Sequence, residues 1–278
     1  MSLPAESTDT SSPSSPRGAA PAPATRELQS LRLTDPLRWL RAGWGDLMAA
    51  PGIALFYGLS FWLLAVMLQA VFHNMPEYTI SFVSGCFLVG PFLAMGLYEV
   101  SRRREQGLPQ SLGASLICWN RHLSSMGTLV LVLLLLELLW GRASLVVFAL
   151  FFNTAMPTTA GVLQAIFNPK NWQFIVLYTT VGAIFAGLVF LTCVVSIPMI
   201  LDRDTDAISA GLASMEAVTS RTGPMLVWGT LIVALVLGAL MLPWALGLLV
   251  VGPWLGHASW HAYRGCFAWR APAAGSPA

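Results

Sequence analysis

VGPWLGHASWHAYR, residues Val251 to Arg264, has an earlier counterpart in the same chain, VGPFLAMGLYEVSR, residues Val89 to Arg102. The two stretches share valine, glycine, proline, leucine and the closing arginine, and at two further positions one aromatic residue replaces another. Each copy is the second half of an apolar run, has its proline near mid-run and ends in polar and basic residues. This pattern predicts an internal repeat and is typical of a helix that leaves a bilayer on its charged side.

The composition of the chain is that of a membrane protein. Hydrophobic residues make up 56% and charged residues only 10%, whereas soluble domains have roughly 25% charged residues. A helix that spans a bilayer needs about 20 mostly apolar residues. The sequence therefore predicts an all-α membrane protein with six transmembrane helices, at Ile53–Phe72, Ile80–Leu97, Gly127–Phe152, Phe174–Leu201, Met225–Leu242 and Trp244–Ala262.

Three amphipathic segments precede alternate spans, at Leu37–Ala50, Ser115–Ser124 and Ala207–Arg221. Tryptophan and arginine at helical spacing suit the membrane surface. The chain thus resembles three units, each an interfacial amphipathic helix followed by a hairpin of two spans. The alternative is that a loop beside a membrane is amphipathic by chance.

The basic residues predict an orientation, because Lys and Arg in short loops favour the cytoplasm. Thirteen arginines lie before the first predicted span or after the second, fourth and sixth. Only Lys170 lies in a loop on the other side. Six spans with the N-terminus and the C-terminus both in the cytoplasm is the arrangement that places these arginines together.

The predicted domain organisation has three parts. Residues 1–31 form a disordered cytoplasmic tail rich in Ser, Pro and Ala, residues 32–267 form the six-helix membrane domain, and residues 268–278 form a short cytoplasmic tail. The longest outer loop, residues 153–173, has a predicted short helix at Ala160–Phe167. A net charge of +2 without dense basic clusters argues against nucleic acid as a partner.

Four runs of the sequence carry a resemblance to a known family: LRWLRAGWGDL, GPFLAMGLYEVSRRREQGLP, VGAIFAGLVFLTCVVSIPMILDRDTDA and GPWLGHASWHAYR. They are similar to a family of bacterial integral membrane proteins catalogued as domain of unknown function 2189. The resemblance covers roughly Arg32 to Phe267. It implies a bacterial inner-membrane protein of about six spans, and it supplies no mechanism.

His257 and His261 are the candidate metal ligands. They are four residues apart, so they share one helical face with about 5 to 6 Å between Cβ atoms. Zinc normally takes three or four protein ligands, and the third would come from Cys266, Glu99 or Asp202. The alternative is that both histidines form hydrogen bonds between helices at the interface.

Glu137 and Arg142 are the only charges well inside an apolar stretch, and a buried ionisable residue in a membrane is a functional candidate. Five residues turn a helix by about 140° beyond one full circle, so the two side chains leave from different sides. Arg142 is expected at the outer interface and Glu137 about one turn deeper, where it is protonated, paired or hydrated. Both a structural role and an ion path stay open.

The remaining candidate polar sites are Glu99 and Arg102, in the first copy of the repeat, and Asp202, after the fourth span. Asp202 begins an acidic cluster that lacks the glycine and glutamate of a calcium loop. Capping of the helix that follows, from about Ala207, is the more economical role for that cluster. No nucleotide loop, nucleophile elbow or HExxH motif occurs, so no catalytic residue and no cofactor are predicted.

These features together favour a non-enzymatic scaffold, assembly or accessory protein of the bacterial inner (plasma) membrane. Its expected partners are the lipid bilayer and either a membrane protein complex or a second copy of the chain. The alternative is a small transporter or a metal-handling membrane protein.

Overall fold

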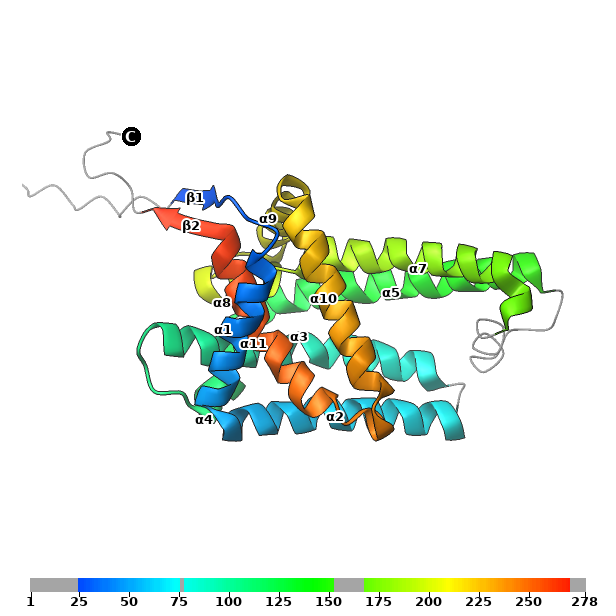
Figure 1. Cartoon of the computed structure of the whole chain (residues 1–278), viewed down its shortest axis with the longest axis horizontal. Helices are drawn as coiled ribbons and strands as arrows, with labels where there is room; N and C mark the ends of the chain where they lie inside the picture. The colour runs from blue at the N-terminus through cyan, green and yellow to red at the C-terminus, as the bar shows by residue number, and fades with distance from the viewer. Residues whose placement is uncertain (1–24, 76–77, 153–167, 271–278) are drawn as a thin grey trace, which may run out of the picture.

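The computed structural model describes residues 25–75, 78–152 and 168–270. Residues 1–24 of the first predicted tail, residues 271–278 of the second, and the predicted short helix at Ala160–Phe167 lie outside the described residues. The described chain is helical apart from one pair of short strands (Figure 1), which confirms the predicted all-α class.

Figure 1 names the helices and strands in chain order. Short turns of 3-10 helix lie at Cys118–Arg121, Pro169–Asn171 and Pro243–Ala245. The helices are α1 (Asp35–Ala49), α2 (Pro51–Asn74), α3 (Thr79–Glu105), α4 (Leu112–Ile117), α5 (Leu123–Phe151), α7 (Trp172–Cys193), α8 (Ser196–Arg203), α9 (Ala207–Ser220), α10 (Thr222–Met241) and α11 (Leu248–Cys266).

In the described residues, five stretches are long and apolar enough to cross a membrane. They coincide with the first five predicted spans. Helix α11, which covers the sixth predicted span, is not among them, because polar and charged side chains occupy its second half. Six spans and the orientation therefore stay a prediction. The five stretches are Pro51–Asn74, Ser81–Glu105, Leu123–Phe151, Pro169–Arg203 and Thr222–Met241.

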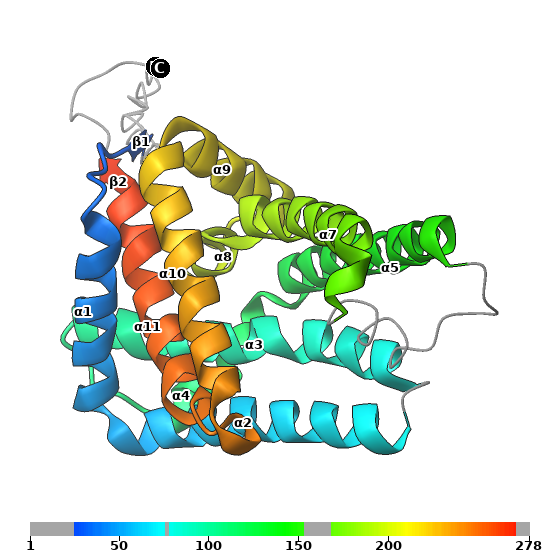
Figure 2. The same ribbon diagram turned by 45° about the vertical axis from the view of Figure 1, so that its right-hand side comes forward.

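The helices run in two main directions. Helices α2 and α3 lie side by side, and α5 pairs with α7, whereas α1, α10 and α11 run across the direction of α2 (Figures 1 and 2). The turn between α10 and α11 contacts α2 at mid-length, where Trp62 Nε1 donates to the Trp244 carbonyl oxygen at 2.9 Å. The tip of the α10–α11 hairpin therefore lies beside the middle of α2.

The stretch predicted as one span at Phe174–Leu201 is divided into α7 and α8. Pro198 explains the break, since proline donates no backbone hydrogen bond and its ring clashes with the carbonyl four residues earlier. Ser196 begins α8 and donates to the Ala210 carbonyl oxygen at 3.1 Å, which joins α8 to α9. Residues 196–201 are all buried, so α8 belongs to the core.

Helix α11 lies at the centre of the packing, and glycines let its neighbours approach. A Cβ atom on Gly43 of α1 would lie 2.5 Å from the Ala258 nitrogen, and one on Gly58 of α2 would lie 2.1 Å from the Leu249 oxygen. Real Cβ atoms do not come that close to backbone atoms. Only glycine fits at these two crossings, so α1 and α2 touch the backbone of α11 directly.

The two copies of the repeat lie against each other. The first copy is in α3 and the second in α11. Their prolines, Pro91 and Pro253, lie inside those helices, as their position near the middle of each apolar run predicts. A Cβ atom on Gly256 would lie 3.2 Å from the Leu97 Cβ atom. The repeat therefore supplies both sides of one helix contact.

The predicted interfacial segments form helices over different lengths. Residues 37–50 and 207–221 correspond to α1 and α9, whereas residues 115–124 are divided between α4, a 3-10 turn and the start of α5. On α1, Trp44 and Met48 are exposed while Trp39 and Asp46 are buried. The inner face of α1 thus packs on α11.

A strand pair, which the sequence did not predict, joins the two ends of the described chain. Strands β1 (Thr25–Leu28) and β2 (Phe267–Arg270) are antiparallel, with Leu28 opposite Phe267. Strand β1 lies within residues 1–31, the segment predicted as the first tail, and β2 runs from Phe267, the last residue of the predicted membrane domain, into the second predicted tail. The pairing places both ends of the described chain beside the end of α11.

Candidate functional site

The polar half of α11 meets polar residues of α1 and α3 at the end of the bundle where the arginines gather. We call this set the α11 polar cluster. It joins three helices that are far apart in sequence. Its members are Asp46, Ser101, Arg104, Glu105, His257, Trp260, His261 and Arg264.

Asp46 of α1 is the buried anion of the cluster, with only 4% of its surface exposed. Its Oδ2 lies 2.8 Å from His261 Nε2, and its Oδ1 accepts from Arg104 Nη1 at 2.5 Å. Burial alone would raise the pKa of Asp46, but hydrogen bonds from His261, Ser101 and Arg104 outweigh it and hold that pKa below 3.8. Asp46 is therefore a carboxylate at neutral pH.

His257 belongs to α11 and is completely buried where α11 packs against α3. Its Nδ1 lies 2.8 Å from the Ser101 hydroxyl, whereas its Nε2 has no hydrogen-bond partner among the described residues. Ser101 belongs to the first copy of the repeat and His257 to the second. This hydrogen bond therefore joins the two copies.

Glu105, the last residue of α3, receives two donors from α11. Trp260 Nε1 donates to its Oε2 at 3.0 Å, and Arg264 Nε donates to its Oε1 at 2.9 Å. Tyr263 turns toward α8 instead and donates to Asp202 Oδ2 at 2.8 Å. Through Glu105 and Asp202 the end of α11 is tied to both α3 and α8.

The predicted metal pair is divided between two partners, since His257 contacts Ser101 and His261 contacts Asp46. No three His, Cys, Asp or Glu side chains gather as a metal site within residues 25–75, 78–152 and 168–270. This geometry favours the alternative of hydrogen bonds between helices. Metal binding by the pair stays a prediction, which elemental analysis of protein purified without a His-tag would test.

Glu99, Arg102 and Asp202 line one polar groove of about 710 Å³ between α3, α4 and α8. Glu99 is buried and forms an ion pair with Arg102, with 2.7 Å between Oε2 and Nη2.

Asp206 serves as the predicted cap of α9, because its Oδ2 accepts a hydrogen bond from the Ser209 backbone amide at 2.9 Å. Hydrogen bonds from Ser209 keep the pKa of Asp206 below 3.8.

Glu137 and Arg142 lie on α5, away from the α11 polar cluster. Glu137 is 8% exposed, and the Ser84 hydroxyl of α3 donates to its Oε2 at 3.0 Å. Arg142 takes part in none of the ion pairs among the described residues. The two charges are therefore not partners, as their spacing predicts.

Sequence reasoning missed Asp46, the residue on which the cluster is built. A signal was present, because Asp46 follows Trp39 and Gly43 at the i+7 and i+3 spacing of one helical face. A carboxylate in line with apolar positions indicates a buried, paired acid. Ser101 and Glu105 had no such signal, since both lie in an otherwise polar helix end.

The long apolar helices define the class of the protein, an integral membrane protein that crosses the bilayer more than once. The model of a family described as "Predicted integral membrane protein (DUF2189)" matches residues 78–202, from just before α3 into α8. The match confirms the resemblance over this range. No curated protein and no solved structure matches the chain.

Proposed function

We propose that the chain is a non-enzymatic scaffold, assembly or accessory protein of the bacterial inner membrane. The observation that carries the proposal is the state of the α11 polar cluster. Its acids are already ion-paired, Asp46 with Arg104 and Glu105 with Arg264. Groups held in this way join helices, whereas a catalytic acid or base needs access to a substrate.

The arginine-rich end also presents charge outward. Arg38 and Arg41, on the helix that carries Asp46, and Arg121, in the groove beside Asp202, are exposed. Basic residues beside a membrane attract anionic lipid by about 1 kcal/mol each. Exposed arginines at positions 38, 41 and 121 suit a partner with an acidic surface and a bilayer with anionic headgroups.

A gentle-detergent purification tests this proposal. We expect the full chain to bring down a membrane protein in stoichiometric amount, and a variant with Arg38→Gln, Arg41→Gln and Arg121→Gln to lose most of it. The variant should stay in the membrane, because its apolar helices are unchanged. Purification of the wild-type chain without any partner, together with solute uptake by the reconstituted chain, would contradict the proposal.

The proposed orientation places both termini in the cytoplasm. A reporter active only in the cytoplasm should give signal when fused after Arg104 or Asp206 and stay silent after Asn74 or Lys170.

Whether the chain crosses the membrane five or six times depends on where the α10–α11 turn lies. A cysteine in place of the exposed Leu242 should react with an impermeant maleimide from outside if six helices cross, and stay unreactive if the turn lies in the bilayer beside Trp62.

A small transporter is the second candidate function. The observation in its favour is a cavity among α3, α5 and α7 that contains Glu137. A buried acid beside a cavity at membrane level is a feature of ion and solute paths. Uptake of a solute into vesicles that contain only this chain would support the transporter over the scaffold.

A further inference from the structure

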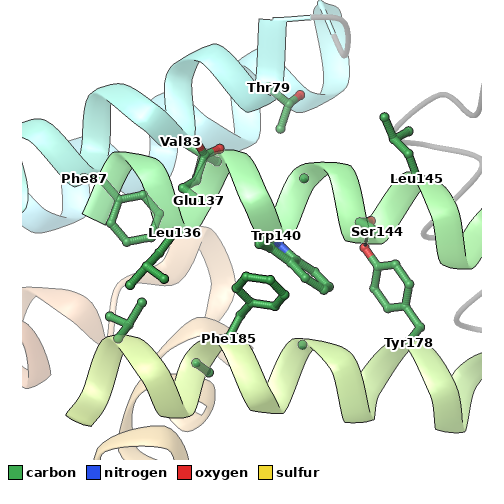
Figure 3. A pocket seen from close by; sticks show the side chains of 14 residues that line it. Thr79, Val83, Phe87, Leu136, Glu137, Trp140, Ser144, Leu145, Tyr178 and Phe185 are labelled. Atoms are coloured by element: carbon green, nitrogen blue, oxygen red, sulfur yellow. Dashed lines mark hydrogen bonds between the residues drawn. The ribbon is translucent and has the colours of Figure 1, made fainter. Parts of the chain in front are cut away.

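A cavity of about 650 Å³ lies between α3, α5 and α7 (Figure 3). Its volume is in the range of small-molecule sites, about 300 to 1,000 Å³. Its walls are mainly apolar, and four aromatic rings contribute to them: Phe87, Trp140, Tyr178 and Phe185. Gly182 provides the close approach of α7 to the Trp140 ring, since a Cβ atom there would lie 3.3 Å from that ring.

Glu137 is the acid of this cavity. Its side chain is buried and reaches toward α3, where Ser84 donates a single neutral hydrogen bond to Oε2 at 3.0 Å. None of the ion pairs among the described residues includes Glu137. A carboxylate in apolar surroundings is costly without an opposite charge. The cavity therefore contains an acid whose counter-charge the described chain does not supply.

The aromatic rings are held in place beside this acid. Trp140 packs edge-on against Tyr178 with 5.2 Å between ring centroids, and lies 6.0 Å from the Phe185 ring. The Tyr178 hydroxyl is fixed by a 2.9 Å hydrogen bond from Ser144. Aromatic faces attract cations, and this attraction is stronger away from water. The aromatic rings and the Glu137 carboxylate thus both favour a cationic ligand.

We propose that this cavity binds a lipophilic organic cation, with its charged centre near Glu137 and its apolar body against Trp140, Tyr178 and Phe185. Such a molecule supplies the missing counter-charge and reaches the cavity through the bilayer. The inference does not rest on the scaffold proposal, because binding is measured on the purified chain and a partner is identified by co-purification. Either result can fail while the other stands.

Two ions of equal size and opposite charge test the proposal in the wild-type protein. Equilibrium dialysis of the full chain in an uncharged detergent should show saturable binding of tetraphenylphosphonium. Tetraphenylborate, with the same four phenyl rings, should neither bind comparably nor displace the cation. Equal binding of both ions would overturn the proposal, because the cavity would then be a space for any apolar molecule.

Variants of the chain provide the second arm. Glu137→Gln keeps size and hydrogen bonding but removes the charge, and should weaken cation binding about tenfold or more. Glu216→Gln removes a carboxylate on α9, outside the cavity, and should leave binding unchanged. Cation binding by Glu137→Gln equal to that of wild type would overturn the proposal. If this variant aggregates on gel filtration, the comparison of the two ions in wild type decides.

Discussion

Gly58→Ala is expected to destabilise the protein by about 3 kcal/mol, because the new methyl group would meet the backbone of α11. The added Cβ would lie 2.1 Å from the Leu249 carbonyl oxygen, which no rotamer can avoid. Helices α2 and α11 would have to separate along their contact. Alanine favours helix by up to about 1 kcal/mol over glycine, so a loss of stability is evidence of the close approach. Thermal unfolding in detergent measures it.

Gly52→Ala is the matched control on the same helix. No atom lies within 4 Å of a Cβ at Gly52, so this substitution should leave stability unchanged or raise it slightly. A second matched pair lies on α1, where Gly43→Ala should be destabilising and Gly45→Ala tolerated, since their Cβ atoms would have neighbours at 2.5 Å and 3.5 Å. Equal stability of Gly58→Ala and Gly52→Ala would contradict the packing around α11.

Asp46→Ala is expected to cost about 2 kcal/mol. Removal of one partner from a fully buried ion pair costs roughly 3 to 5 kcal/mol. A smaller value is expected here because the Arg104 side chain is 42% exposed and keeps part of its hydration. Alanine leaves Arg104 and His261 without their acceptor in the contact of α1 with α3 and α11. Chemical denaturation of the detergent-solubilised chain measures the loss.

The same substitution should change the pH dependence of stability. The pKa of Asp46 is lower in the folded chain than 3.8, its ordinary value. Its stabilising contribution is therefore fully present above about pH 4 and is lost as the pH falls through the folded pKa. Wild type and Asp46→Ala should converge in stability at acidic pH.

Glu216→Ala is the control for Asp46→Ala. It removes the acid of a solvent-exposed ion pair with Arg26, and such pairs contribute about 0 to 1 kcal/mol. If Asp46→Ala were no more destabilising than Glu216→Ala, or if its effect persisted unchanged at acidic pH, Asp46 would not be the centre of the cluster.

The fold class could be predicted from the sequence because length and apolarity of each span are local properties. Periodic patterns also predicted the helices α1 and α9 and the positions of Pro91 and Pro253 inside helices. The mutual contact of the two copies could not be predicted. Similar sequences indicate helices of similar structure, but they do not indicate whether the two helices pack against each other.

The candidate sites show the same limit. His257 and His261 share one helical face, as their spacing indicates, yet that face meets Ser101 of α3 and Asp46 of α1. The identity of the opposing helix depends on glycines such as Gly43 and Gly58, which fix where the crossings fall. Glu137 was predicted as a buried acid. The cavity beside it depends on how α3, α5 and α7 are arranged, which no local pattern records.

The contact between the two copies of the repeat is the central claim, and a disulfide tests it most directly. In a chain whose native cysteines are replaced, Leu97→Cys with Gly256→Cys should cross-link on mild oxidation. A Cβ on Gly256 lies 3.2 Å from the Leu97 Cβ, close to the 3.5 to 4.5 Å typical of disulfides. Val89→Cys with Gly256→Cys, about two turns away along α3, should stay reduced. The contact predicts a cross-link only between Cys residues at positions 97 and 256, seen as a gel mobility shift that reductant reverses. Failure of this pair to cross-link, or equal cross-linking of the pair at positions 89 and 256, would contradict it.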